Sequence, residues 1–197
     1  MKKLLFTSIL LLVFTSIFSC KQNTENTSQN DTISSEVIDT DTTIYGVSGN
    51  GTSMHSLELI TDNGDTVRFI IDEDALYASY GDSIDTNIFP NIVKGGLISD
   101  NHYAVIASKN EDGEMVATNV INMSSLFGKW KSLERNFEII EDGTVMSTHQ
   151  VESNPYTAWR IHNGKLILSN DTFDVLTIGP DTLEIENNHG IFIFSRP

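Results

Sequence analysis

Apolar and polar residues alternate in short runs along most of the chain after residue 42. In the run 56–61, Leu57 and Leu59 fall on one side of the chain, and the run 66–72 alternates in the same way. The side chains of a strand point alternately to its two faces, so each run can turn one apolar face towards a core. Asn63-Gly64 lies between the two runs and accepts the positive φ of a tight turn. The pattern therefore predicts a β-hairpin.

The segment 43–122 contains further runs of this kind around a change of period. One run precedes the hairpin at 44–49, and two follow it at 103–108 and 115–122. Between them, 74–81 starts with an acidic residue, continues with good helix formers and ends on glycine, which predicts one or two helical turns and then a loop. Three strands, a short helix and two strands follow each other in this order in a five-stranded OB-type Greek-key barrel. We therefore predict an OB-like β domain over 43–122.

The segment 123–197 has the pattern of a second all-β unit with six or seven short strands. Asn163-Gly164 is a two-residue hairpin loop, and its register places Trp159 opposite Leu168 and Ile161 opposite Leu166. Closing such a meander into a small barrel or half-barrel removes exposed strand edges. The predicted fold class is all-β, with two small antiparallel barrels or half-barrels. The predicted strands of the second unit are 126–132, 137–140, 158–162, 165–169, 173–178, 182–186 and 191–196.

The first residues have the pattern of an export signal. Lys2 and Lys3 precede the apolar stretch 4–18, which has the length of a signal-peptide core and is short for a membrane-spanning helix. Cys20 follows directly after a serine and is the only cysteine of the chain. These residues resemble a bacterial lipobox, which implies a signal peptide over 1–19, a lipid on Cys20 and an anchor in the cell envelope. A buried free thiol is the alternative interpretation of Cys20.

The segment 20–42 is predicted to be a disordered tether behind the lipid. It is rich in Ser, Thr, Asn, Gln and Asp and has few apolar residues, so it cannot bury enough surface to offset the entropy of ordering. Asp31-Thr32-Ile33 and Asp41-Thr42-Thr43 resemble O-glycosylation sites of some Gram-negative anaerobes. Thr32 and Thr42 are therefore candidate modification sites, with ordinary surface threonines as the alternative.

The net charge and the absence of catalytic motifs argue against nucleic-acid binding and enzymatic activity. The formal net charge is −15 and becomes −17 without residues 1–19, because two lysines and no acids are removed. This acidity disfavours nucleic acid as a partner. The five histidines are scattered singly, and the sequence contains neither a nucleophile turn nor a metal-ligand motif. We therefore expect no enzymatic activity, no catalytic residue, no cofactor and no metal, although a metal site assembled in space stays open.

The second unit resembles the lipocalin-like domain of lipoproteins from Gram-negative anaerobes of the Bacteroides type. Gly128-Lys129-Trp130 corresponds to the Gly-x-Trp near the start of such domains, and the segment 49–59 resembles the region before them. The resemblance implies extracytoplasmic binding, without a defined ligand. The unit is short for a lipocalin and has no disulfide. The other stretches that carry the resemblance are 126–127, 137–139, 153–159, 171–175 and 190–192.

Large aromatic side chains are the candidate binding residues. They fill the interior of a small barrel or line a ligand cavity. We expect a lipid-anchored protein of the cell envelope, held in the outer membrane, on either its periplasmic or its surface side. It is expected to bind a small apolar molecule, a glycan fragment or a protein partner. The alternative is an accessory subunit of an outer-membrane or surface complex without a small ligand. The candidate side chains are Trp130, Phe137, Trp159, Phe173 and Phe194.

Overall fold

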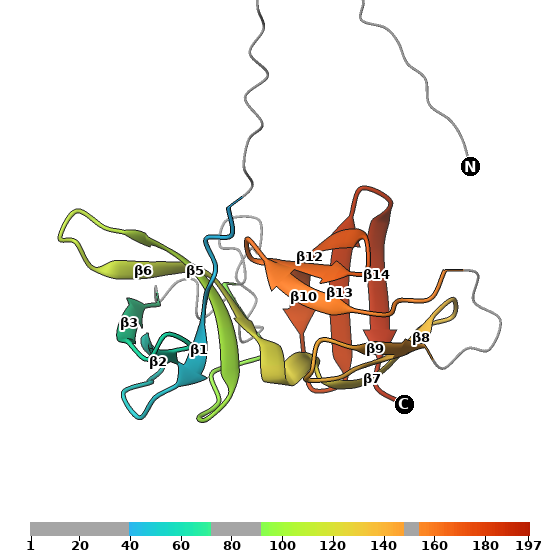
Figure 1. Ribbon diagram of the computed structural model, residues 1–197, viewed down its shortest axis with the longest axis horizontal. Helices are drawn as coiled ribbons and strands as arrows, with labels where there is room; N and C mark the ends of the chain where they lie inside the picture. Colours follow the sequence, from blue (N-terminus) through green and yellow to red (C-terminus); the bar gives the residue numbers. More distant parts are fainter. Residues whose placement is uncertain (1–39, 72–91, 148–153) are drawn as a thin grey trace, which may run out of the picture. The chain divides into compact units, whose positions relative to one another are not determined.

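The computed structural model describes residues 40–71, 92–147 and 154–197, which form strands and one short 3-10 helix (Figure 1). The fold is all-β, as predicted, and contains two barrel-like sheets. Asp39–Pro197 form one compact unit that includes both sheets. The predicted helical turns at 74–81, the signal segment and most of the tether lie outside the described residues.

The first sheet has the strand pairing of an OB-type barrel. β1 pairs with β2 on one side and with β5 on the other, β3 follows β2, and β6 follows β5, all antiparallel. A parallel pair between Ile70 of β3 and Val116 of β6 closes the ring. This five-stranded closure is the Greek-key arrangement that the order of elements predicted. The strands are β1 (Ile44–Ser48), β2 (Ser56–Thr61), β3 (Thr66–Ile70), β5 (His102–Lys109) and β6 (Met115–Asn122).

One strand of this sheet was not predicted. β4 (Val93–Lys94) pairs in parallel with Val120 and Ile121 of β6, in a segment that was predicted to be a loop. Two residues are too few to show an alternating pattern, so periodicity could not detect this strand.

The alternating residues of β2 and β3 supply the core of the first sheet. Leu57, Leu59 and Phe69 are fully buried, as the two-residue period requires. Tyr103 is buried with them, and its hydroxyl oxygen accepts a hydrogen bond from the Ile98 N–H at 2.7 Å. The remaining buried members are Ile71, Val93, Val105, Ala117 and Val120.

The second sheet is an eight-stranded up-and-down meander, whereas six or seven strands were predicted. Ser195 of β14 pairs with Lys131 of β7 and so joins the last strand to the first. Between β9 and β10, a single bridge from Thr144 to Ala158 connects the two ends of the sheet, which is therefore nearly closed. The strands are β7 (Gly128–Lys131), β8 (Asn136–Ile139), β9 (Val145–Ser147), β10 (Trp159–His162), β11 (Lys165–Leu168), β12 (Asp171–Ile178), β13 (Thr182–Asn187) and β14 (Gly190–Ser195).

Two local predictions in the second unit were wrong. β9 was missed because it has only three residues. The strand predicted over 126–132 begins at Gly128 instead, because η1 (Met123–Leu126) precedes it. The Asn122 side chain accepts a hydrogen bond from the Ser125 N–H and starts this helical turn, a cap that the apolar pattern does not reveal.

The predicted hairpin at Asn163-Gly164 is confirmed. Trp159 pairs with Leu168 and Ile161 with Leu166, in the predicted register. Asn163 and Gly164 have φ angles of +48° and +69°, which residues of these types accept most readily.

Candidate binding surfaces of the two barrels

The five candidate aromatic side chains lie in the core of the second barrel. Their exposed fractions are 1% for Trp130, 2% for Phe137, 6% for Trp159, 1% for Phe173 and 2% for Phe194. Phe137 and Phe194 meet edge to face with ring centroids 5.0 Å apart. Such contacts, together with the low exposure of all five side chains, are typical of a packed interior.

Both indole N–H groups are bonded inside the protein. The Nε1 of Trp130 donates to the Leu126 carbonyl at 2.7 Å, and the Nε1 of Trp159 donates to the Ile140 carbonyl at 2.6 Å. A buried indole without such an acceptor would carry a desolvation penalty. Neither tryptophan therefore offers a polar group to a bound molecule.

Arg196 covers Trp130, a contact that was not predicted from the sequence. Its guanidinium carbon lies 4.1 Å from the centre of the Trp130 ring, which is the geometry of a cation–π contact. Its Nη1 and Nη2 donate to the carbonyls of Phe127 and Ser125, each at 2.9 Å. A Cβ on Gly128, where φ is +108°, would lie 2.7 Å from Arg196 Nη1. The glycine of the Gly-x-Trp stretch therefore makes room for this arginine.

A second arginine covers another aromatic side chain of the same barrel. The guanidinium carbon of Arg135 lies 4.4 Å from the centre of the Tyr156 ring. Tyr156 is buried and meets Phe137 edge to face at 5.6 Å. These aromatic rings pack with aliphatic side chains of the same barrel in one buried cluster.

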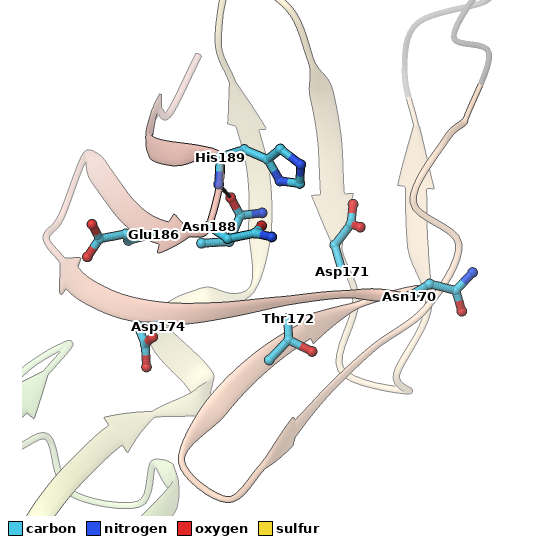
Figure 2. Close-up of a pocket in the computed structure, with 8 residues that line it drawn as sticks. Asn170, Asp171, Thr172, Asp174, Glu186, Asn188 and His189 are labelled. Carbon is cyan, nitrogen blue, oxygen red and sulfur yellow. Dashed lines mark hydrogen bonds between the residues drawn. The ribbon is translucent and has the colours of Figure 1, made fainter.

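A polar pocket of about 550 Å³ lies on the outer surface of the second barrel (Figure 2). Figure 2 shows that its side chains come from β12 with the residue before it and from the β13–β14 hairpin. Carboxylates, amides, a hydroxyl and an imidazole line it, so it offers donors and acceptors, and no Phe, Tyr or Trp is among its described lining residues. Asp174 is paired with Lys165, and Asn187 Oδ1 accepts from the His189 N–H at 2.8 Å. The lining residues are Asn170, Asp171, Thr172, Asp174, Glu186, Asn187, Asn188 and His189.

A more apolar groove of about 530 Å³ lies between residues of both sheets. Gly95 and Gly96 form part of its wall, but their carbonyls already accept hydrogen bonds from Asn122. Arg196 also lines the groove, and its guanidinium N–H groups donate hydrogen bonds to protein carbonyls. The groove therefore has few polar groups left to orient a ligand.

Thr42, the described candidate for glycosylation, lies in a contact between the two sheets. Its N–H and hydroxyl donate to Asn163 Oδ1 at 2.8 and 3.1 Å, and the residue is exposed. Asp41 Oδ1 accepts from the N–H groups of Thr43 and Asn163, each at 2.9 Å. The Tyr45 hydroxyl lies 2.7 Å from Asp41 Oδ2 and 2.8 Å from the Ile161 carbonyl, and its single proton is shared between these two acceptors. Cys20 and Thr32 lie outside the described residues.

Three groups near this contact have shifted pKa values. Burial raises the pKa of Asp41, but hydrogen bonds from Thr43, Asn163 and Tyr45 prevail and hold it well below its ordinary value of 3.8. Burial and the bond to Asp41 raise the pKa of Tyr45 to about 12. Burial lowers the pKa of Lys94 to about 8, against the field of Asp174. Lys94 donates to Asn119 Oδ1 at 2.6 Å.

Within the described parts of the chain, no three His, Cys, Asp or Glu side chains are grouped so that they could hold a metal ion. In the same parts, no helix is long and apolar enough to span a membrane. The fold and surface define an all-β protein with an OB-type barrel and an eight-stranded meander barrel whose interior is packed with its own side chains. Comparisons with known protein families, with curated proteins and with solved structures gave no significant match.

Proposed function

We propose that this chain is a lipid-anchored extracytoplasmic lipoprotein without enzymatic activity, which binds a hydrophilic ligand on the outside of its second barrel. A glycan fragment is the favoured ligand class. The polar pocket on β12 and the β13–β14 hairpin carries this proposal, since it is hollowed and lined entirely by side chains that form hydrogen bonds. Sugar hydroxyls both donate and accept, and they match a mixed set of carboxylates, amides and hydroxyls.

The packed interior supports an external site over an internal one. A ligand cavity of a few hundred Å³ is typical of small-molecule sites, and the five aromatic side chains occupy the space where it would lie. An apolar small molecule inside the barrel is therefore the least favoured of the expected ligands.

The glycan proposal can be tested by titrating the protein with a panel of neutral oligosaccharides and following its amide NMR signals. We expect shifts centred on 170–174 and 186–189, and loss of binding in Asp171→Ala and Glu186→Ala. Glu111→Ala, an exposed acidic residue of the β5–β6 turn, is the matched control and keeps binding. Shifts elsewhere, or equal binding by all variants, would contradict the proposed site.

The second candidate function is that of an accessory subunit in an envelope complex. Large apolar side chains exposed on the second barrel favour it, because contiguous apolar surface marks protein contacts. Leu133, Ile191 and Ile193 are the most exposed of these. Purification from the native host in mild detergent tests this candidate: a partner present in fixed stoichiometry supports it, and its absence argues against it.

The lipid anchor rests on Cys20 and the stretch before it. Metabolic labelling with a fatty acid that carries a click handle should mark the native chain and leave Cys20→Ala unlabelled. Equal labelling of both proteins would refute the anchor without touching the pocket proposal.

A further inference from the structure

Strand β14 has a partner along its whole length on one side only. It pairs with β13 from Gly190 to Ser195, but with β7 only through Ser195 and Lys131. Among the described strands, none lies beside Gly190–Phe194 on the β7 side. In Figure 1 the β13–β14 hairpin reaches well past β7. As far as the described residues go, Gly190–Phe194 of β14 are therefore an open sheet edge.

The register fixes which backbone groups point to this open edge. Asn187 and Gly190 pair across a two-residue loop, so they exchange hydrogen bonds with each other. Bonded and non-bonded pairs alternate along an antiparallel ladder. Phe192 therefore bonds to β13, whereas the N–H and C=O groups of Ile191 and Ile193 point away from it. Ser195 has the same orientation, and its pairing with Lys131 agrees with this alternation.

The edge also lacks the usual protection against association. Exposed edges are commonly guarded by lysine, proline or a bulge. Gly190–Ser195 contains no charged residue and no proline. Ile191 and Ile193 are 58% and 59% exposed, and Leu133, at the β7–β8 turn, is fully exposed. A groove of about 460 Å³ lies between this turn and β14; both isoleucines and Leu133 line it, and Glu134 and His189 supply its charged and titratable side chains.

The sequence of β14 around Phe192 reads the same in both chain directions. Ile191-Phe192-Ile193 has the same side chains in both directions about Phe192. If two copies of β14 pair antiparallel across a two-fold axis at Phe192, Ile191 faces Ile193 of the second copy. The backbone N–H and C=O groups of Ile191 and Ile193 point away from β13 and towards the second copy. Each Ile191–Ile193 pair is therefore a hydrogen-bonded pair, and the Phe192–Phe192 pair between them is a non-hydrogen-bonded one. A two-fold contact uses the same patch on both copies, and here it brings isoleucine against isoleucine, with no charged residue along the strand.

We propose that the open edge of β14 is a dimerisation site, where a second copy of this chain adds its own β14 in antiparallel register about Phe192. The two second barrels then share one continuous sheet through Ile191 and Ile193. Ile191 of each copy then lies beside Ile193 of the other copy on the outer face of the shared sheet. This contact uses neither the glycan pocket nor the lipid anchor, so it stands apart from the proposed function.

The first test measures the dimerisation constant of the full chain in detergent by analytical ultracentrifugation. Ile193→Lys places two charges in the contact and should raise Kd at least about tenfold. Its side chain is exposed, so circular dichroism should be unchanged. Ile60→Lys is the matched control, an isoleucine 51% exposed on the first sheet, and should leave Kd unchanged. A native chain that stays monomeric at high concentration, or an equal effect of both lysines, would overturn the proposal.

The second test reads the register by disulfide formation. Ile191→Cys and Ile193→Cys are made separately in a Cys20→Ser background, with different tags, and oxidised alone and mixed. In a bonded antiparallel pair the Cα atoms lie about 5.5 Å apart, within the range of a disulfide. We expect cross-links mainly between Ile191→Cys and Ile193→Cys chains. Equal cross-linking of each variant with itself, or none in the mixture, would contradict this register.

Discussion

At the scale of single residues, Trp130 is one of the large buried side chains in the core of the second barrel. It is 1% exposed, donates its N–H to the Leu126 carbonyl and lies under Arg196. The Gly-x-Trp stretch predicted a barrel start and left open whether Trp130 lines a cavity. Arg196 lies far away in sequence, at the chain end, and no local pattern could have paired it with Gly128 and Trp130.

Trp130→Ala should lower the free energy of unfolding by about 3–5 kcal/mol, because it removes a large buried ring and leaves a cavity. Chemical denaturation followed by circular dichroism measures this loss. Leu133→Ala is the control, since Leu133 is fully exposed and its truncation should change stability by less than about 0.5 kcal/mol. Similar losses in the two variants would mean that Trp130 is not part of a packed core.

At the scale of elements, alternation and turn residues predicted the longer strands and the register of the Asn163-Gly164 hairpin. They failed for β4 and β9, which have two and three residues, and at η1, where the Asn122 cap interrupts the apolar run. The five candidate aromatic side chains are buried in the second barrel, and their role in binding stays a prediction. The polar pocket was not predicted, because its residues come from separate elements and share no sequence pattern.

Gly164→Ala tests the contact of the Asn163-Gly164 hairpin with the first sheet. A Cβ at Gly164 would lie 2.7 Å from Asn119 Nδ2 and 2.8 Å from Ile106 Cγ1. Gly113 also has a positive φ but open space around it, so Gly113→Ala carries the backbone strain alone. We expect a loss of about 1 kcal/mol for Gly113→Ala and at least about 1 kcal/mol more for Gly164→Ala, measured by denaturation. Equal losses would show that the hairpin does not pack closely there.

Asp41 should make stability depend on acid pH. Its folded-state pKa lies below the ordinary 3.8, so the unfolded chain takes up protons first as the pH falls. The stabilisation is complete above about pH 5 and is lost progressively below it. Asp41→Asn should lose about 1 kcal/mol at neutral pH, a modest figure because water screens this partly exposed side chain. Its stability curve should approach that of the native chain in acid, and a constant gap across this pH range would contradict the assignment.

At the scale of the whole molecule, the two barrels share packing and hydrogen bonds. Ala104 and Ile121 of the first sheet belong to the same buried cluster as the core of the second. Asp41, Thr42 and Thr43 bind the Asn163-Gly164 turn. The order of strands predicted both barrels, but such contacts depend on side chains from distant segments and could not be read from local patterns.

This sharing predicts that the barrels unfold together. Trp130 and Trp159 both lie in the second sheet, so tryptophan fluorescence reports on that sheet. Leu57→Ala, in the core of the first sheet, should lower the unfolding free energy seen by fluorescence by about 2–5 kcal/mol. An unchanged fluorescence transition, with loss of structure in the first sheet, would show two independent units.

The central claim is that the second barrel is filled by its own side chains and binds from the outside. Native mass spectrometry of the protein, extracted in mild detergent from its own host, tests it most directly. We expect chains with no apolar small molecule retained, and any associated mass to be a glycan, a second copy or a protein. A stoichiometric apolar small molecule that is lost in Trp130→Ala and kept in Leu133→Ala would contradict the claim.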